Sequence, residues 1–159
     1  MKYNFLMFSY FFIMMSCNTK VKKDYEYIDG FKKYITNTFP SENKNEHTIY
    51  YLIPVNGCES CIDLNLLNNN SFTSKIDLKI ILIGETYDPI RKSKLDNLKI
   101  NFNLLYDLTE EIFKYETSFS KPMIVEIKNN NCLFHLNVSD FKIDDARKYF
   151  ELKEIISSI

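Results

Sequence analysis

The 159-residue chain carries 20 basic and 21 acidic residues, and its formal net charge of −1 excludes the large positive excess expected of a nucleic-acid-binding protein. Hydrophobic residues make up 45% of the sequence and aromatic residues 15%, which favours a folded domain with a core rich in Phe and Tyr over a disordered chain. Glycine occurs only 3 times, so we expect tight turns at asparagine runs such as 68–70 and 129–131.

The first 16 residues have the pattern of an export signal. Lys2 supplies a positive charge, and the apolar stretch 5–15 is too short to span a bilayer as a helix. The junction Met15-Ser16-Cys17 resembles a bacterial lipoprotein signal, which implies that Cys17 is lipidated, becomes the new first residue and attaches the chain to a membrane. An ordinary cleaved signal and an uncleaved anchor are the alternatives. Export predicts a location in the bacterial cell envelope, facing the periplasm, where disulfides persist.

The length after cleavage suits a single domain. Removing 16 residues from 159 leaves 143, enough for one domain with its own core. We therefore divide the chain into a signal peptide (1–16), a tether with an N-terminal helix (17–40) and a main domain (41–159). The helix is predicted over 25–39, because apolar residues recur there at helical spacing, and Pro40 ends it.

The most informative stretch is a strand followed by two cysteines. The β-branched and aromatic residues of 48–53 predict a buried strand, which is broken by the turn-forming residues of 54–57. Cys58 and Cys61 follow at once. The apolar residues of 62–67 then predict a helix that begins near Cys58.

A Cys-x-x-Cys pair at the junction of a strand and a helix is typical of a redox dithiol. Unpaired backbone N–H groups and the positive end of the helix dipole favour the thiolate of Cys58, which is its nucleophilic form. Cys61, one turn later, can then close a disulfide and release a mixed-disulfide partner. A structural disulfide and half of a zinc site are the alternatives. Zinc normally has four ligands, and only Cys132, His47 and His135 remain to complete the set.

The rest of the chain alternates between strands and helices. Strands are predicted at 76–83, 102–106, 123–127 and 132–138, and helices at 88–98, 107–115 and 144–156. Asp107 is expected to cap its helix together with Glu110, in the manner of a capping box. Alternation implies parallel strand pairs, and the closing hairpin adds antiparallel strands. The predicted fold class is α/β, with a mixed central β-sheet flanked by helices on both faces.

On three segments the chain resembles the thioredoxin-like, membrane-anchored redoxins, a family of bacterial thiol-disulfide oxidoreductases. The first is the strand that leads to Gly57-Cys58-Glu59-Ser60-Cys61, the second is 103–109 before a helix, and the third is Ser120-Lys121-Pro122 before a strand. The resemblance implies a thioredoxin-like fold. It also implies that the Lys121–Pro122 bond is cis, that Pro122 packs against the disulfide and that Lys121 contacts the substrate.

The activity implied by the resemblance is thiol-disulfide exchange with exported proteins. Cys58 would attack, Cys61 would resolve and Pro122 would shape the substrate groove, with no cofactor or metal, in a monomer. The alternatives are a non-catalytic binding lipoprotein with a structural disulfide, and a copper chaperone that uses both cysteines and a histidine. If Pro122 lies beside the dithiol, the positive charge of Lys121 would lower the pKa of Cys58, whereas Glu59 opposes this effect. A solvated loop lysine without a role in the site is the alternative for Lys121.

Three further residues could take part in chemistry. We expect Cys132 to be a buried strand residue and not a third redox group. His135 is expected to be structural or surface-facing, because it alternates with Leu133 in the same predicted strand. His47 precedes a strand, and the sequence indicates no partner for it.

Overall fold

The computed structural model describes residues 25–42, 46–56, 77–101, 104–139 and 142–157. Its helices are α1 (Ile28–Thr38), α2 (Pro89–Asn101) and α3 (Ile143–Ser157), with the short 3-10 helices η1 (Pro40–Glu42) and η4 (Glu111–Lys114). Its strands are β1 (His47–Pro54), β2 (Asp77–Ile83), β3 (Leu104–Asp107), β4 (Met123–Lys128) and β5 (Asn131–Asn137). Every predicted strand is present, whereas the helix predicted to begin near Cys58 lies outside the described residues.

The strands form one five-stranded mixed sheet in the order β3-β2-β1-β4-β5. β1 is parallel to β2, and β2 is parallel to β3. β4 runs antiparallel to β1, and β5 runs antiparallel to β4. The predicted combination of parallel strands with a closing antiparallel hairpin is therefore confirmed, and β1 occupies the centre of the sheet, where both faces are covered.

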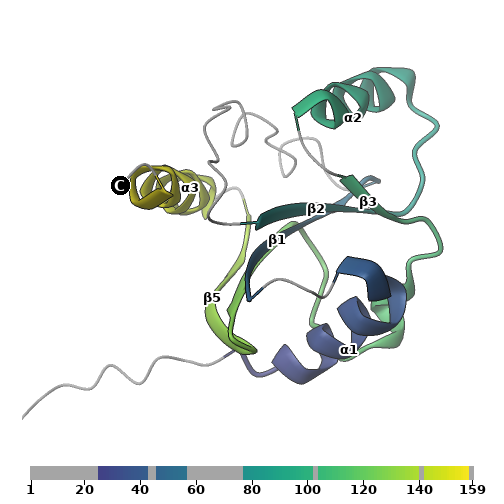
Figure 1. Cartoon of the computed structure of the whole chain (residues 1–159). Coiled ribbons are helices and arrows are strands. Elements are labelled where there is room, and N and C mark those ends of the chain that lie inside the picture. Colours follow the sequence, from purple (N-terminus) through teal and green to yellow (C-terminus); the bar gives the residue numbers. More distant parts are fainter. Residues whose placement is uncertain (1–24, 43–45, 57–76, 102–103, 140–141, 158–159) are drawn as a thin grey trace, which may run out of the picture.

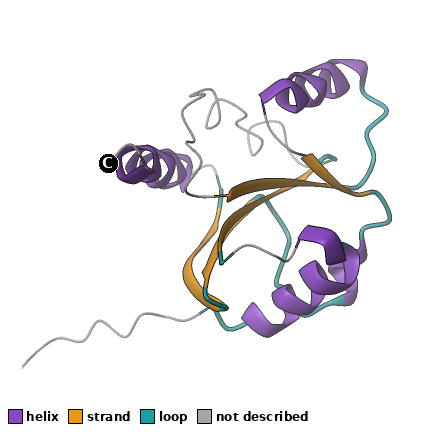
Figure 2. Cartoon of the chain, viewed as in Figure 1, coloured by secondary structure: helices purple, strands orange, loops and turns teal. Residues whose placement is uncertain are grey.

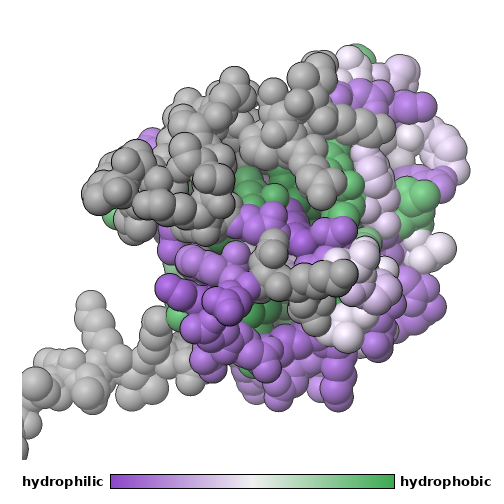
Figure 3. All heavy atoms as spheres, in the orientation of Figure 1, coloured by the Kyte–Doolittle hydropathy of each residue, from purple (hydrophilic) through white to green (hydrophobic). Residues whose placement is uncertain are grey.

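Helices cover both faces of the sheet, as predicted (Figures 1 and 2). On one face, Tyr50 and Leu52 of β1 pack with buried residues of α1 and η4. On the other face, Tyr51 and Ile53 pack with Leu95 of α2 and with buried residues of α3. The alternation along β1 is the two-residue period of a strand, with each set of side chains directed to its own layer. Figure 3 shows mainly hydrophilic side chains over the α1 layer and hydrophobic atoms between α2 and the sheet.

α1 lies very close to the loop before β4. A Cβ atom added to Gly30 would lie 2.0 Å from the carbonyl oxygen of Glu116, a distance that real Cβ atoms do not reach. Phe31, Tyr34 and Ile35, on the inner side of the helix, are buried against the sheet. The small size of Gly30 therefore lets the helix backbone approach the loop, which brings these large side chains into the core.

The β4–β5 turn confirms the expected use of asparagine. Asn129 and Asn130 have φ values of 48° and 67°, in the left-handed region that asparagine tolerates better than most residues. Two consecutive left-handed residues suit the twist of a hairpin. Asparagine here replaces the glycine that this sequence so rarely uses.

The helix predicted over 107–115 is wrong in its type and length. The chain forms only η4, a 3-10 helix of 4 residues, because Glu110 adopts a left-handed φ of 56°. Asp107 does act as a cap, since its carboxylate accepts the backbone N–H groups of Glu111 at 2.8 Å and Ile112 at 3.0 Å. The capping box with Glu110 is not formed, because a left-handed residue cannot belong to the first helical turn.

Candidate functional site

The carboxyl ends of the three parallel strands meet at one edge of the sheet. The N–H of Val55, just after β1, donates to the carbonyl of Ile83 at 2.9 Å. The N–H of Gly84, just after β2, donates to the carbonyl of Asp107 at 2.9 Å. These bonds hold the ends of β1, β2 and β3 level with one another. In open α/β sheets, ligands generally bind beyond the carboxyl ends of the strands.

β4 brings Pro122 to the same edge. Leu52 of β1 is paired with Met123, the first residue of β4, so Pro122 lies alongside the last residues of β1. Pro122 is buried, and its carbonyl accepts the N–H of Val138 at 2.7 Å. Lys121 is exposed. The pairing thus places two of the predicted site residues beside the strand end from which the chain continues to the cysteine pair.

The predicted cis bond before Pro122 is wrong. Among the residues that the structure describes, no peptide bond is cis, so Lys121 and Pro122 are joined in trans. The trans form is the more stable even before proline, by about 0.5–1 kcal/mol. The trans peptide bond is compatible with the hydrogen bond that the N–H of Val138 donates to the carbonyl of Pro122. The position of Pro122 is fixed by strand pairing and by burial.

The three other predicted site residues, Cys58, Cys61 and Cys17, lie outside the described residues. Their sequence positions are still informative. Cys58 follows Val55 by three residues, so covalent geometry keeps the two Cα atoms within about 11 Å of each other. The carboxyl end of β1 is therefore the described part of the chain nearest in sequence to the predicted nucleophile, Cys58.

Arg91 is a residue at this edge that the sequence patterns did not indicate. Its Nη1 atom donates to the carbonyl of Val55 at 2.6 Å, which links α2 to the turn after β1. The helix itself begins as predicted, with Pro89 in its first position and Asp88 accepting the N–H of Ile90 at 2.9 Å. Capping by Asp88 fixes the start of α2, and the hydrogen bond from Arg91 to the backbone of Val55 links the helix to the end of β1.

Asp107 is buried at the end of β3, and its carboxylate oxygens already accept hydrogen bonds from neighbouring elements of the fold. Besides capping η4, its Oδ2 atom accepts the hydroxyl of Tyr34 on α1 at 3.0 Å. Burial and, secondarily, the negative charge of Asp107 raise the pKa of Tyr34 well above its usual range. A carboxylate with three donors joins β3, η4 and α1, and we assign it a structural role.

The two histidines lie away from this edge. His47, for which the sequence indicated no partner, has its Nε2 atom 2.7 Å from Oε1 of Glu126. His135 is half-buried and stacks on Tyr25, with the ring centroids 4.1 Å apart. Burial, with a smaller effect of Lys142, lowers the pKa of His135. His135 is thus structural, as expected.

Cys132 is half-buried on β5, and its Sγ atom lies 3.4 Å from the carbonyl oxygen of Phe134. Its position in a strand is as predicted, whereas the predicted full burial is not found. Within the described ranges, no group of three or more His, Cys, Asp or Glu side chains could hold a metal ion.

These features define an α/β protein of thioredoxin-like architecture. A Cys-x-x-Cys motif follows the central parallel strand, and a buried proline precedes the antiparallel strand beside it. No protein-family model matches the sequence, and no curated protein sequence matches it.

Solved structures of similar fold do exist. The chain is similar to a candidate thioredoxin from Neisseria meningitidis, with 13% identity, a TM-score of 0.47, and coverage of 68% of this chain and 74% of that one. It is also similar to a secreted disulfide oxidoreductase of Mycobacterium tuberculosis homologous to E. coli DsbE, with 12% identity, a TM-score of 0.42, and coverage of 65% and 81%. At these identities and TM-scores, we infer the function from the chain's own residues.

Proposed function

We propose that this protein exchanges thiols and disulfides with exported proteins through Cys58 and Cys61. The observation that carries the proposal is the sheet register. The Cys-x-x-Cys motif begins four residues after Pro54, the last residue of β1, and the pairing of Leu52 with Met123 brings the buried Pro122 to this strand end. The sequence therefore continues into the dithiol from the strand end beside which Pro122 lies.

The reaction needs only the two cysteines and the substrate. The thiolate of Cys58 attacks one sulfur of a substrate disulfide, which forms a mixed disulfide and releases the other substrate sulfur as a thiolate. The thiolate of Cys61 then attacks the Cys58 sulfur, which forms the Cys58–Cys61 disulfide and releases the second substrate sulfur. The substrate gains two electrons and the protein loses two. The reverse sequence oxidises a substrate dithiol, and an envelope thiol-disulfide protein restores the starting state.

Charge at this sheet edge supports the thiolate. Arg91 donates to the carbonyl of Val55, three residues before Cys58, and Lys121 precedes the proline beside the end of β1. A positive charge near a cysteine lowers its pKa, because it stabilises the thiolate and not the thiol. Glu59 acts in the opposite direction. The balance of these charges sets how reactive Cys58 is at neutral pH.

The location proposed for this reaction is the bacterial cell envelope. The export signal at 1–16 and the Ser16-Cys17 junction support a lipid-anchored protein whose domain faces the periplasm. In the described part of the chain, no helix combines the length and hydropathy needed to cross a bilayer. A lipid on Cys17 would hold the domain near exported proteins while they acquire their disulfides.

A trapping experiment tests the activity and the two roles. We expect Cys61→Ser to accumulate mixed disulfides through Cys58, because the resolving thiol is gone, and Cys58→Ser to accumulate few. The species are counted by non-reducing electrophoresis after acid quenching. Equal trapping by both variants, or none by either, would contradict the assignment.

Equilibrating the protein with a series of mixtures of reduced and oxidised glutathione distinguishes a redox-active Cys58–Cys61 pair from a structural disulfide. A redox-active pair titrates within the series, whereas the structural disulfide of a non-catalytic lipoprotein resists reduction. A copper chaperone would instead bind one Cu(I) ion per chain, and the ion would block alkylation of both cysteines.

A further inference from the structure

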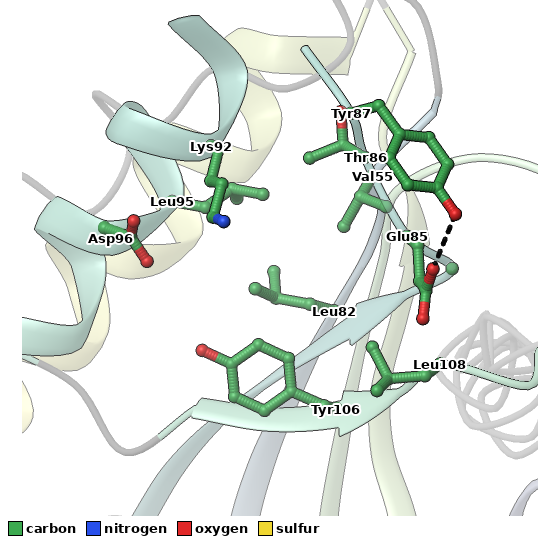
Figure 4. Close-up of a pocket in the computed structure, with 11 residues that line it drawn as sticks. Val55, Leu82, Glu85, Thr86, Tyr87, Lys92, Leu95, Asp96, Tyr106 and Leu108 are labelled. Atoms are coloured by element: carbon green, nitrogen blue, oxygen red, sulfur yellow. Dashed lines mark hydrogen bonds between the residues drawn. The ribbon is translucent and has the colours of Figure 1, made fainter. Parts of the chain in front are cut away.

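A pocket of about 340 Å³ lies between helix α2 and strands β2 and β3 (Figure 4). Its floor is apolar: Val55 follows β1, Leu82 belongs to β2, and Leu95 projects from α2. Tyr106 of β3 and Leu108 close one side. This volume and this lining are those of sites that bind organic groups, since a few polar atoms at the rim of an apolar hollow fix the orientation of the ligand.

The apolar surface continues beyond the pocket. Tyr87 is 90% exposed and Leu108 53%, and both line the pocket, while Ile90 in the first turn of α2 is 66% exposed. Large apolar side chains seldom cluster on a protein surface that contacts no partner or ligand. A single small molecule would fill the hollow and leave Tyr87 and Ile90 uncovered. A polypeptide can place one side chain in the hollow and cover the rim with its neighbours.

The rim carries more negative than positive charge. Glu85 and Asp96 line the pocket together with Lys92, and the guanidinium of Arg91, outside the lining, donates to the backbone carbonyl of Val55. Glu110 lies nearby, because its Oε1 atom would be 2.8 Å from a Cβ atom on Gly84, which is itself in the lining. Acidic groups around an apolar hollow complement a ligand that combines an apolar group with a positive charge.

The pocket is also close to the proposed dithiol. Val55 contributes to the pocket floor and precedes Cys58 by three residues, a span of at most about 11 Å. An extended chain covers this distance with three or four residues. A substrate whose cysteine reacts with Cys58 could therefore reach the pocket with a side chain a few residues away.

We propose that this pocket is the substrate-binding site for an extended segment of an exported polypeptide, and that it accepts a large apolar side chain flanked by Lys or Arg. The proposal rests on the proposed function, because it names the class of substrate that the dithiol would meet. Binding places the substrate near Cys58 before exchange. It also gives preference to chains that expose apolar residues, as incompletely folded proteins do.

A binding measurement without redox chemistry tests the site. The protein is the full chain carrying Cys58→Ser and Cys61→Ser, purified in detergent. The probe is a fluorescent, cysteine-free decapeptide of Gly and Ser with one central Phe between two lysines, and binding is followed by anisotropy. We expect at least about tenfold weaker binding when Ser replaces the Phe, because burial of the ring is lost. We expect about fivefold weaker binding at low salt when glutamates replace the lysines.

Matched protein variants locate the binding. Leu108→Ser should weaken binding about fivefold or more, whereas Leu152→Ser, at a side chain of α3 that is 57% exposed against 53% for Leu108, should not change it. Glu85→Gln should reduce the preference for lysine over glutamate, and Glu151→Gln on α3 should not. Both leucines are exposed, so these changes spare the core, and circular dichroism verifies the fold.

Three outcomes would overturn the proposal. These are equal binding of the Phe and Ser peptides, equal effects of the two leucine variants, and binding of N-acetylphenylalanine amide as tight as that of the peptide, which would indicate a small-molecule site. Because the cysteines are absent from the tested protein, failure of thiol-disulfide exchange does not affect this result. Failure of peptide binding likewise leaves the exchange activity to be decided by trapping.

Discussion

Glu126 of β4 and His47 of β1 hydrogen-bond across the sheet, with His47 Nε2 2.7 Å from Glu126 Oε1. Two further donors complete a buried cluster around this carboxylate: Lys153 Nζ at 2.6 Å and the Tyr149 hydroxyl at 2.8 Å, both from α3. Burial alone would raise the pKa of Glu126, but the bonds from Lys153, His47 and Tyr149 together lower it below its ordinary 4.5. The cluster therefore stabilises the charged carboxylate and attaches α3 to the sheet.

The first prediction is that this cluster makes stability depend on pH. Because the folded pKa of Glu126 is lowered, its contribution is complete above about pH 4.5 and is lost as pH falls through the folded value. Glu126→Gln should lower the free energy of unfolding by about 2 kcal/mol at pH 7, since it leaves Lys153 without a charged partner. Urea unfolding at pH 7, 4.5 and 3 measures both effects.

The difference between wild type and Glu126→Gln should narrow as the pH falls below 4.5. Glu151→Gln, at an exposed carboxylate of α3, serves as the control and should have little effect. A constant difference across the three pH values would show that the charge of Glu126 does not contribute.

The second prediction concerns the close approach of α1. In most helix interiors, Gly→Ala stabilises a protein by about 0.5–1 kcal/mol. At Gly30 we expect the opposite sign, a loss of about 2 kcal/mol, because the new Cβ would lie 2.0 Å from the backbone oxygen of Glu116. Thermal and urea unfolding of Gly30→Ala, with Lys33→Ala on the exposed side of α1 as control, measures this. A stabilised Gly30→Ala protein would show that the helix can move away at no cost.

The third prediction concerns Lys121. If its charge favours the Cys58 thiolate, Lys121→Ala should raise the pKa of Cys58, and a rise of about one unit corresponds to about 1.4 kcal/mol. The rate of iodoacetamide alkylation as a function of pH, in a Cys61→Ser background, gives this pKa. Lys128→Ala removes an exposed lysine at the opposite end of β4 and should leave the pKa unchanged. Equal shifts in both variants would indicate only a general effect of net charge.

The fourth prediction concerns the N-terminus. Mass spectrometry of the protein from bacterial membranes should find a diacylated or triacylated Cys17 as the first residue, with residues 1–16 absent. Cys17→Ser should release the protein from the membrane fraction or block its processing. An unmodified Cys17 in the wild type would exclude the lipid anchor and leave an ordinary cleaved signal or an uncleaved anchor.

Local patterns in the sequence predicted most of the fold. Continuous apolarity marked β1 and β2, since strands covered on both faces need apolar residues at nearly every position. The run 129–131 predicted the hairpin turn, because asparagine tolerates the left-handed φ values found there. The position of the cysteine motif after β1 was predicted from the turn-forming residues 54–57, which end the strand. The helix over 107–115 failed for the converse reason, because a single left-handed residue, Glu110, leaves no local signal in the sequence.

The sequence by itself determined the strands, helices α1, α2 and α3, and the place of Cys58 and Cys61 in the order, because these depend on side-chain periods and turn chemistry within a few residues. Only the tertiary structure decided that Glu126 meets His47, 79 positions away, that the end of β1 meets Pro122, and that Leu82 and Leu95 line one pocket. Such contacts depend on strand register and helix docking. A shift of one residue in register would turn Glu126 to the other face of the sheet, so long-range pairing decides which residues meet.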